Sequence, residues 1–289
     1  MIRQAILVLG MHRSGTSALS AVVAKLGAQP PKTLMRPNKN NPRGYWESKR
    51  FFRFHERLLR SAGGAWADWD GFNAAWLNTA DAARFGAEFR VLLKQEFGES
   101  PLFSIKDPRM CRLLPFWLEQ LRTLNITAKA IIAIRNPLDV ACSLQARDGI
   151  GIHRALLIWL RHSLDAEFET RHLARSIVRY EDLLSDWRAL ATKIAGDIAV
   201  KWPNWPGSVE REIDSFLSSE LRHHAIDDSA FETDARIHDW IRRAFEALRL
   251  LAGKGGETNH VALTTLDEIR EEFNRMSLVF GPVVREYES

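Results

Sequence analysis

Residues that can hold an anion are concentrated between positions 10 and 17, in the segment Gly-Met-His-Arg-Ser-Gly-Thr-Ser. An apolar run, Ile6 to Leu9, precedes this segment, and apolar residues at helical spacing follow from Ala18 to Leu26. The pattern predicts a strand, a tight turn and a helix. Because the first N–H groups of a helix have no partner within it and the helix dipole adds partial positive charge, this turn suits a phosphate or a sulfate.

The segment differs from a nucleoside-triphosphate P-loop at one position. Thr16 stands where a P-loop carries the lysine that reaches the β- and γ-phosphates. Arg13, inside the turn, is the nearest cation. The same residues are also compatible with an ordinary strand-to-helix connection in which Ser14, Thr16 or Ser17 caps the helix. A second observation is therefore needed to favour an anion site.

A second polar cluster follows another apolar run. Residues Ala128 to Ile134 are rich in β-branched side chains, which is typical of a buried parallel strand, and Arg135 ends the run. Pro137 suits the first turn of a helix that continues past Ser143. Arg135 therefore lies at the carboxyl end of a strand and Ser143 two turns into the next helix. Ligands of open α/β sheets bind at that edge.

Together, Gly10-x-x-Arg13-Ser14-Gly15-Thr16-Ser17 and Arg135-Asn136-Pro137-x-Asp139-x-x-x-Ser143 resemble the two phosphate motifs of sulfotransferases that use 3′-phosphoadenosine-5′-phosphosulfate (PAPS). The resemblance covers roughly residues 4 to 185. It implies that the first loop holds the 5′-phosphosulfate through Arg13, Ser14, Gly15, Thr16 and Ser17.

The same resemblance implies roles for four residues further along the chain. Arg135 and Ser143, eight residues apart, would hold the 3′-phosphate. Arg147 occupies a position at which tyrosylprotein sulfotransferases place a further cofactor-binding arginine. Tyr180 lies in a segment similar to the one that presents a tyrosine to the adenosine, although a tyrosine at a strand end is otherwise most often part of the core with its hydroxyl at the rim.

Sulfuryl transfer needs a general base for the acceptor and cations for the leaving bisphosphate. Glu47 lies about as far past the first motif as the family places its catalytic glutamate, and we expect it to be the base. The alternative is that Glu47 begins a helix and only complements the helix dipole.

A further cation is expected directly after the short strand at 102–105. Lys106-Asp107-Pro108 is similar to a segment of tyrosylprotein sulfotransferases in which the lysine serves the transferring group, so Lys106 would act with Arg13. A solvated strand end is the alternative for Lys106. We expect Asp107 to form a structural ion pair with Arg109, while Arg109 stays undecided between cofactor, acceptor and fold.

Histidines give weaker signals. His12 is an alternative base, although a loop residue beside an anion site is expected to bind the anion or to be solvated. The basic segment Leu221-Arg222-His223-His224 matches, by character only, the late segment with which sulfotransferases close over the cofactor, and a solvated helix end explains it equally well. No histidine has a metal-ligand spacing with cysteines or carboxylates, and no metal is expected.

The order of elements predicts a P-loop-like, three-layer α/β fold with a central parallel sheet flanked by helices. Strands are expected near residues 5, 102, 129 and 176, with helices between them, including 82–97 and 112–124 and one from Glu47 onward. Helices at 208–221, 230–252 and 262–278 predict a mainly helical C-terminal region, with a surface turn at 253–256. We expect one domain over 1–289, with a core to about 200, a helical insertion at about 47–98 and a helical cap over about 201–289.

Composition agrees with this fold class. The chain has 289 residues, of which 46% are apolar and 26% charged, which is ample for one large α/β domain. Two cysteines, no signal-peptide pattern and no apolar stretch near the roughly 20 residues that span a bilayer predict a soluble, cytoplasmic protein. The net charge of +4 favours a polyanionic cofactor or an acidic acceptor, but no dense Lys/Arg block indicates nucleic-acid binding.

We therefore expect an enzyme that transfers a sulfonate from PAPS to a hydroxyl acceptor without a metal. The segment from Asn38 to Glu47 and the Lys-Asp-Pro-Arg segment resemble bacterial sulfotransferases, many of which are associated with glycan assembly. A carbohydrate or glycan precursor is therefore the first choice of acceptor, and a tyrosine or phenol, a lipid or a natural product the second. Five aromatic residues either face the acceptor or are buried between helices: Tyr45, Trp46, Trp66, Trp69 and Trp76.

Two other function classes are less well supported. A nucleotide kinase needs the missing lysine and a Walker B strand that ends in aspartate, whereas the later strands end in Lys106, Arg135 and Tyr180. A catalytically idle nucleotide-binding protein is disfavoured by the joint presence of Arg13, Glu47 and Lys106.

Overall fold

A parallel sheet of four strands forms the centre of the protein. The computed structural model describes residues 2–39, 41–217 and 228–288. The strands are β1 (Gln4–Leu9), β2 (Leu102–Lys106), β3 (Thr127–Ile134) and β4 (Ala174–Arg179), in the order β2-β1-β3-β4. Gln4 pairs with both Leu102 and Thr127, so the first strand is central. The chain leaves β1 to one side for β2 and returns to the other side for β3, which places the switch in strand order beside β1.

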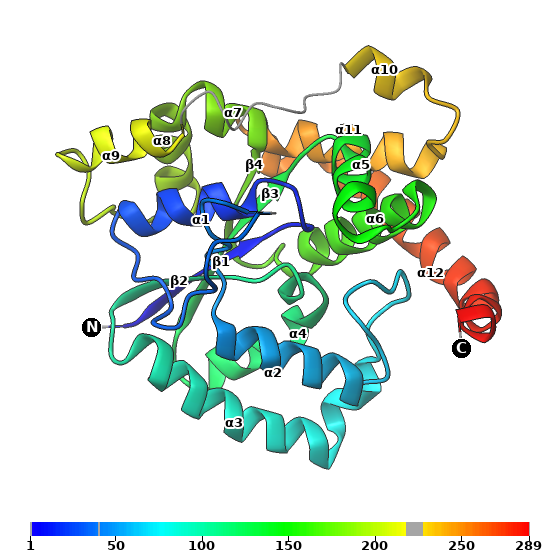
Figure 1. Ribbon diagram of the computed structural model, residues 1–289, viewed down its shortest axis with the longest axis horizontal. Helices are drawn as coiled ribbons and strands as arrows, with labels where there is room; N and C mark the ends of the chain where they lie inside the picture. The colour runs from blue at the N-terminus through cyan, green and yellow to red at the C-terminus, as the bar shows by residue number, and fades with distance from the viewer. Residues whose placement is uncertain (1, 40, 218–227, 289) are drawn as a thin grey trace.

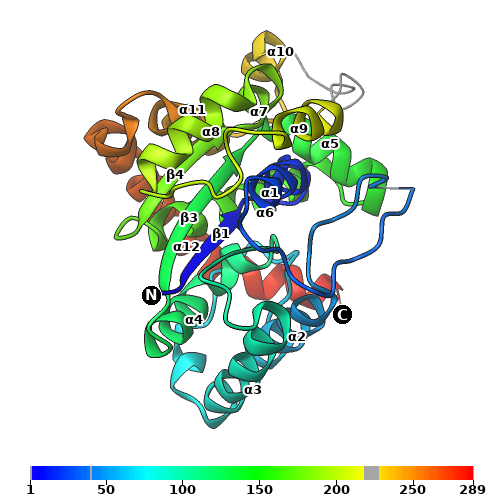
Figure 2. The same ribbon diagram turned by 90° about the vertical axis from the view of Figure 1, so that its left-hand side faces the viewer.

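Helices cover both faces of the sheet. The helices up to the last strand are α1 (Thr16–Lys25), α2 (Lys49–Ser61), α3 (Ala80–Phe97), α4 (Met110–Thr123), α5 (Pro137–Asp148) and α6 (Ile152–Glu169), with a 3-10 turn at Ala74–Asn78. After β4 follow α7 (Tyr180–Ser185), α8 (Trp187–Asp197), α9 (Val209–Phe216), α10 (Asp228–Thr233), α11 (Asp239–Ala252) and α12 (His260–Glu288). Figures 1 and 2 show α2, α3 and α4 together on the side of the strands opposite to α1, α8 and α9.

Alternation along the strands divides the apolar core into two layers. In β1, Ala5, Leu7 and Leu9 face the layer built with α2 to α6, α11 and α12. Ile6 and Val8 face the other layer, which α1, α7, α8 and α9 complete. Successive strand residues point to opposite faces, and all five of these side chains are fully buried. The expected three-layer α/β fold with a central parallel sheet is confirmed.

The helices after residue 200 contribute to both layers. Val209 and Ile213 of α9 lie in the layer of α1, whereas Leu248 of α11 and Phe273 of α12 lie in the opposite one. The expected single helix at 230–252 is wrong, since α10 ends at Thr233 and α11 begins at Asp239. The side chain of His238 accepts a hydrogen bond from the N–H of Trp240, which caps a new helix at this point.

Sequence periodicity missed two helices, α6 and α8. Helix α6 is buried over the whole run from Ile158 to Glu167, although this run includes the charged residues Arg161, Asp165 and Glu167. No described helix is both long and apolar enough to cross a membrane.

Candidate active site

The loop between β1 and α1 has positive backbone φ values that residues other than glycine rarely adopt. Gly10, with φ of 132°, lies so close to β3 that a Cβ there would be 2.5 Å from the carbonyl oxygen of Ala133. Arg13 and Gly15 have φ values of 70° and 79°, in the left-handed region that costs a non-glycine residue free energy. Helix α1 begins at Thr16, two residues earlier than its apolar pattern indicated. The predicted strand, turn and helix are thus present.

Tyr180 lies directly against this loop. A Cβ at Gly15 would be 2.0 Å from Cδ2 of Tyr180, so only glycine fits there. The guanidinium of Arg135 lies over the same ring, 5.1 Å from its centroid. Burial raises the pKa of the Tyr180 phenol, partly offset by Arg135. Tyr180 is the first residue of α7 rather than the end of β4, and its ring joins the loop to the end of β3.

The two polar motifs contact each other at the carboxyl edge of the sheet. Nε of Arg13 donates to Oγ of Ser143 at 2.7 Å. Arg135 donates through Nη1 to the carbonyl oxygen of Arg13 at 3.2 Å, and its Nη2 lies 3.1 Å from Oδ2 of Asp139. Asn136 caps α5 by accepting from the N–H of Leu138. Residues 120 to 130 positions apart in the chain therefore form one constellation.

This constellation lines a cavity of about 230 Å³, called here the donor pocket. Arg13, Arg135 and Arg147 all line it, and Arg147 is paired with Asp148 at 2.8 Å. Burial lowers the pKa of Arg13, and the positive charges of Arg147 and Arg135 lower it further. Since three guanidinium groups repel one another there, an anion in the pocket would be stabilised.

Glu47 and Lys106 form a buried ion pair at the edge of the donor pocket. Nζ of Lys106 lies 2.6 Å from Oε1 of Glu47 and also donates to Oγ of Ser17 and the carbonyl oxygen of Tyr45, both at 3.3 Å. Both side chains are 3% exposed. Burial raises the pKa of Glu47, although Lys106 opposes the change. Ser48, not Glu47, caps α2, so Glu47 precedes the helix and does not lie in its first turn.

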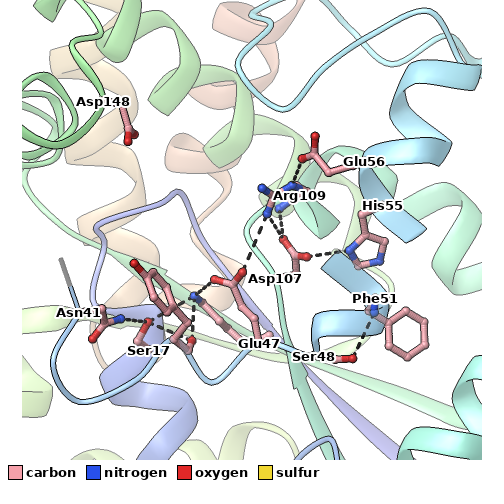
Figure 3. Close-up of polar contacts among 12 residues, drawn as sticks. Ser17, Asn41, Glu47, Ser48, Phe51, His55, Glu56, Asp107, Arg109 and Asp148 are labelled. Carbon is pink, nitrogen blue, oxygen red and sulfur yellow. Dashed lines mark hydrogen bonds and ion pairs between the residues drawn. The ribbon is translucent and has the colours of Figure 1, made fainter. Parts of the chain in front are cut away.

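A buried polar network of Asp107, His55 and Arg109, called here the brace, lies next to this ion pair (Figure 3). Asp107 lies between His55, at 2.9 Å from Nδ1, and Arg109, at 3.0 Å from Nη1. Trp117 Nε1, which can only donate, is 3.0 Å from Nε2 of His55, so His55 is neutral and donates from Nδ1 to Asp107. Burial alone raises the pKa of Asp107, but Arg109 and His55 outweigh it and hold the pKa well below its usual range.

The structural ion pair expected for Asp107 and Arg109 is therefore present. Arg109 also contacts Glu56, and its Nη1 is 3.9 Å from Oε2 of Glu47, so the brace extends to the expected base.

His12 is half-buried, so the expectation that it is solvated is met only in part. Its Nε2 is buried and has no hydrogen-bond partner among the described residues. Its ring packs edge-to-face on Trp66, with 4.6 Å between centroids. Burial, followed by the charges of Arg109, Arg147 and Lys106, lowers the pKa of His12 well below 6.5, so the imidazole is neutral near pH 7.

Most of the residues expected from the sequence meet in the donor pocket. Those that line it are Arg13, Gly15, Thr16, Ser17, Glu47, Lys106, Arg135, Ser143, Arg147 and Tyr180. Ser14 is buried beside them and is 1% exposed. Arg222 and His223 lie outside the described residues. Among the described residues, no cluster of three or more histidine, cysteine, aspartate or glutamate side chains suits a metal ion.

Sequence reasoning assigned no role to several further residues that line the pocket, among them Asn41 and Phe216. Asn41 Nδ2 donates to Oγ of Ser17 at 3.3 Å, and Phe216 of α9 approaches from the C-terminal region. Asn41 belongs to the long loop before Glu47, whose length was the available signal. Nothing in the sequence near Phe216 indicated its position.

The comparisons with known proteins agree with this geometry. A family model described as the sulfotransferase family matches residues 5–204. The chain belongs to the sulfotransferase family. The match includes both motifs of the donor pocket, Glu47 and the Lys106 segment, and it ends before α9. No curated protein matches the chain.

Three solved structures are similar to this sulfotransferase at a distance. The sulfotransferase domain of the olefin synthase of Synechococcus PCC 7002 is 20% identical, with 78% of this chain and 89% of that one covered and a TM-score of 0.46. The sulfotransferase domain from the curacin biosynthetic pathway is 18% identical, with 80% and 89% covered and a TM-score of 0.40. Sulfotransferase STF1 of Mycobacterium tuberculosis H37Rv is 15% identical, with 85% and 77% covered and a TM-score of 0.42. The family assignment rests on the family model.

Proposed function

We propose that this sulfotransferase uses PAPS as its donor and transfers the sulfonate to a hydroxyl group. The observation that carries the proposal is the convergence of Arg13, Arg135 and Arg147 on the loop that starts α1. The depressed pKa of Arg13 reflects positive charges held together in a partly buried place. A donor with a phosphosulfate and a second phosphate would neutralise all three.

The residues of the pocket fit such a donor. The N–H groups at the start of α1 and the side chains of Thr16 and Ser17 suit the 5′-phosphosulfate. The planar fork of Arg135 and the hydroxyl of Ser143 suit the 3′-phosphate. Tyr180 offers an aromatic face beside these groups, which suits the adenine. PAPS supplies an activated sulfonate on a bisphosphate leaving group.

Glu47 and Lys106 are placed to serve the transfer itself. Glu47 accepts the proton of the acceptor hydroxyl while the acceptor oxygen bonds to sulfur and the bond from sulfur to the bridging oxygen breaks. Lys106, adjacent to Glu47, stabilises the negative charge that the leaving bisphosphate gains. Because burial raises the pKa of Glu47, its carboxylate is a stronger base than an exposed glutamate. His12, neutral and with a buried Nε2, is the second candidate for this role.

We propose a carbohydrate or glycan precursor as the acceptor, with a tyrosine or phenol, a lipid or a natural-product hydroxyl as the alternatives. The support is the resemblance of the segments around Glu47 and Lys106 to bacterial sulfotransferases. Cys111 and Cys142 are both free thiols, which supports a cytoplasmic location. Phe216 lines the donor pocket, which supports the helices after residue 200 as its cap.

Transfer of a radiolabelled sulfonate from PAPS tests the proposal directly. The protein is incubated with labelled PAPS and, in parallel, with γ-labelled ATP and magnesium, each with a mixture of saccharides, phenols and hydroxylated lipids. We expect label from PAPS in an acceptor product and none from ATP. Label transferred from ATP instead would contradict the proposal.

A further inference from the structure

A second cavity has a volume of about 800 Å³. We call it the rear cavity. The loop from Ala62 to Ala74 forms one side of it, and helices α4, α6 and α12 form the others. Figure 1 shows this loop, in light blue, beside α4. None of the described residues that line the rear cavity also lines the donor pocket. Its volume lies within the usual range for sites of small organic ligands.

Two buried arginines hold the loop over the rear cavity. Arg112, 4% exposed, donates from Nη1 to the carbonyl oxygen of Asp68 at 2.7 Å. Arg161, 1% exposed, donates from Nε to the carbonyl oxygen of Trp69 at 2.9 Å. Both guanidinium groups also lie 3.3 Å from the carboxylate of Asp165. Arg112 and Arg161 thus hold the loop, and Asp165 neutralises part of their positive charge.

Some polar groups that line the rear cavity have no hydrogen-bond partner among the described residues. Nη2 of Arg161 and Nε of Arg270 are buried and have no partner among the described residues. Buried polar groups normally have partners, so these two donors indicate a ligand that can accept hydrogen bonds.

The balance of charge selects among ligand classes. Among the described residues, the arginines that line the rear cavity are Arg112, Arg161 and Arg270. The carboxylates that oppose them are Asp68, Asp70, Asp165 and Glu169. The described part of the wall therefore has no excess positive charge to hold an anion, and an apolar ligand would leave its polar groups unpaired. Two amides, Asn73 and Asn274, and the ring of Phe72 complete a lining that suits neutral sugar rings.

The two cavities share a wall. Lys106 lines the donor pocket, and five residues later Cys111 lines the rear cavity, where its Sγ accepts from the N–H of Gly10 at 3.2 Å. His12 lines the donor pocket, and its ring packs on Trp66 of the loop that covers the rear cavity. The contact between His12 and Trp66 is therefore the border between the two spaces.

We propose that the rear cavity binds the acceptor, and that the acceptor is a neutral, hydroxyl-rich saccharide whose reacting hydroxyl enters the donor pocket, which His12 and the proposed base Glu47 both line. This inference rests on the proposed function. It adds the position of the acceptor and the residues that select it, and it disfavours phenolic, lipidic and anionic acceptors.

Variants at the rim of the rear cavity test the proposal without disturbing its buried arginines. Ala65 and Ala74 are exposed and line the cavity, so Ala65→Trp and Ala74→Trp place bulk in the path of the acceptor. Ala83→Trp, at an exposed position of α3 away from the cavity, is the matched control. Acceptors are maltose, lactose, cellobiose, the anionic sugar glucuronic acid and the phenol 4-nitrophenol. Transfer from labelled PAPS and calorimetric binding of adenosine 3′,5′-bisphosphate are both measured.

We expect transfer to at least one neutral disaccharide and to neither of the other two compounds. Each rim variant should lower kcat/KM for that disaccharide by at least about tenfold while binding the bisphosphate as the wild type does, and the control should change neither value. Transfer only to glucuronic acid or the phenol, transfer to no disaccharide by a protein that binds the bisphosphate, or an unchanged kcat/KM in both rim variants would overturn the proposal. Failure to bind the bisphosphate would instead count against the proposed donor.

Discussion

The donor pocket and the rear cavity are built in different ways. The donor pocket is formed mainly by the end of β2 and by segments that follow β1, β3 and β4, together with the loop that precedes α2 and Phe216 of α9. The rear cavity is formed by a loop and by helices, and none of its described lining residues belongs to a strand or directly follows one. Motifs at strand ends therefore form much of the donor pocket, whereas the packing of helices against a loop forms the rear cavity, which is the acceptor site in our proposal.

The largest expected effect is on the chemical step, for which Glu47 is the proposed base. Glu47→Gln should reduce kcat by a factor on the order of 10² or more, as expected on loss of a general base, with little change in affinity for adenosine 3′,5′-bisphosphate. Glu56→Gln is the matched control, since Glu56 contacts Arg109 but does not line either cavity. Steady-state kinetics with calorimetry distinguish the two effects. Unchanged turnover in Glu47→Gln would transfer the role of the base to His12.

The second expected effect is on the affinity for adenosine 3′,5′-bisphosphate. Arg135→Ala should weaken binding of adenosine 3′,5′-bisphosphate by roughly 2 to 4 kcal/mol, because a partly buried charged contact to the 3′-phosphate is removed. Arg122→Ala, at an exposed arginine of α4 that pairs only with Glu119 in the described structure, serves as the control. Calorimetry measures both, and equal affinities in the two variants would refute the role of Arg135.

The dependence of kcat on pH should show the titration of the same base, Glu47. Burial raises the pKa of Glu47 above the ordinary 4.5, and the base acts only when ionised. As the pH falls through that raised pKa, kcat should fall by up to about tenfold per pH unit, with full activity on the alkaline side. A profile of kcat against pH at saturating substrates shows this limb. If the residual activity of Glu47→Gln keeps the same limb, another group is titrating.

The smallest effect should be confined to the rear cavity. Asn274→Ala removes an amide whose oxygen accepts from Nη1 of Arg161 at 2.8 Å. We expect KM for the acceptor to rise by about tenfold or less, which corresponds to one hydrogen bond, without a change in donor affinity. Asn78→Ala, at an exposed position outside the cavity, is the control. A weaker donor affinity in Asn274→Ala alone would show that the two cavities are not independent.

The sequence was sufficient to predict the elements that position the donor pocket. The spacing of Arg135 and Ser143 and the glycine-rich turn after β1 are local features, and both lie at the carboxyl edge of the sheet as expected. Parallel strands place their carboxyl ends together, so motifs after β1 and β3 meet by topology alone.

Other features depend on contacts that no local pattern contains. The left-handed conformation of Arg13 depends on the packing of the loop, and the packing of the His12 ring depends on Trp66. Of the aromatic residues expected either to face the acceptor or to be buried between helices, Trp76 is buried in the core and Trp69 stacks on Phe273 of α12. The rear cavity was not predicted at all, because a loop and helices that are remote from one another in sequence form its walls.

The central claim is that the donor pocket recognises a 3′-phosphorylated adenosine donor and not a nucleoside triphosphate. Calorimetric titration of the wild-type protein with adenosine 3′,5′-bisphosphate, beside ATP with magnesium in the same buffer, tests it most directly. We predict saturable binding of the bisphosphate and much weaker or no binding of ATP, because Thr16 replaces the P-loop lysine while Arg135 and Ser143 offer a site for the 3′-phosphate. Binding of ATP as tight as, or tighter than, that of the bisphosphate would contradict the account.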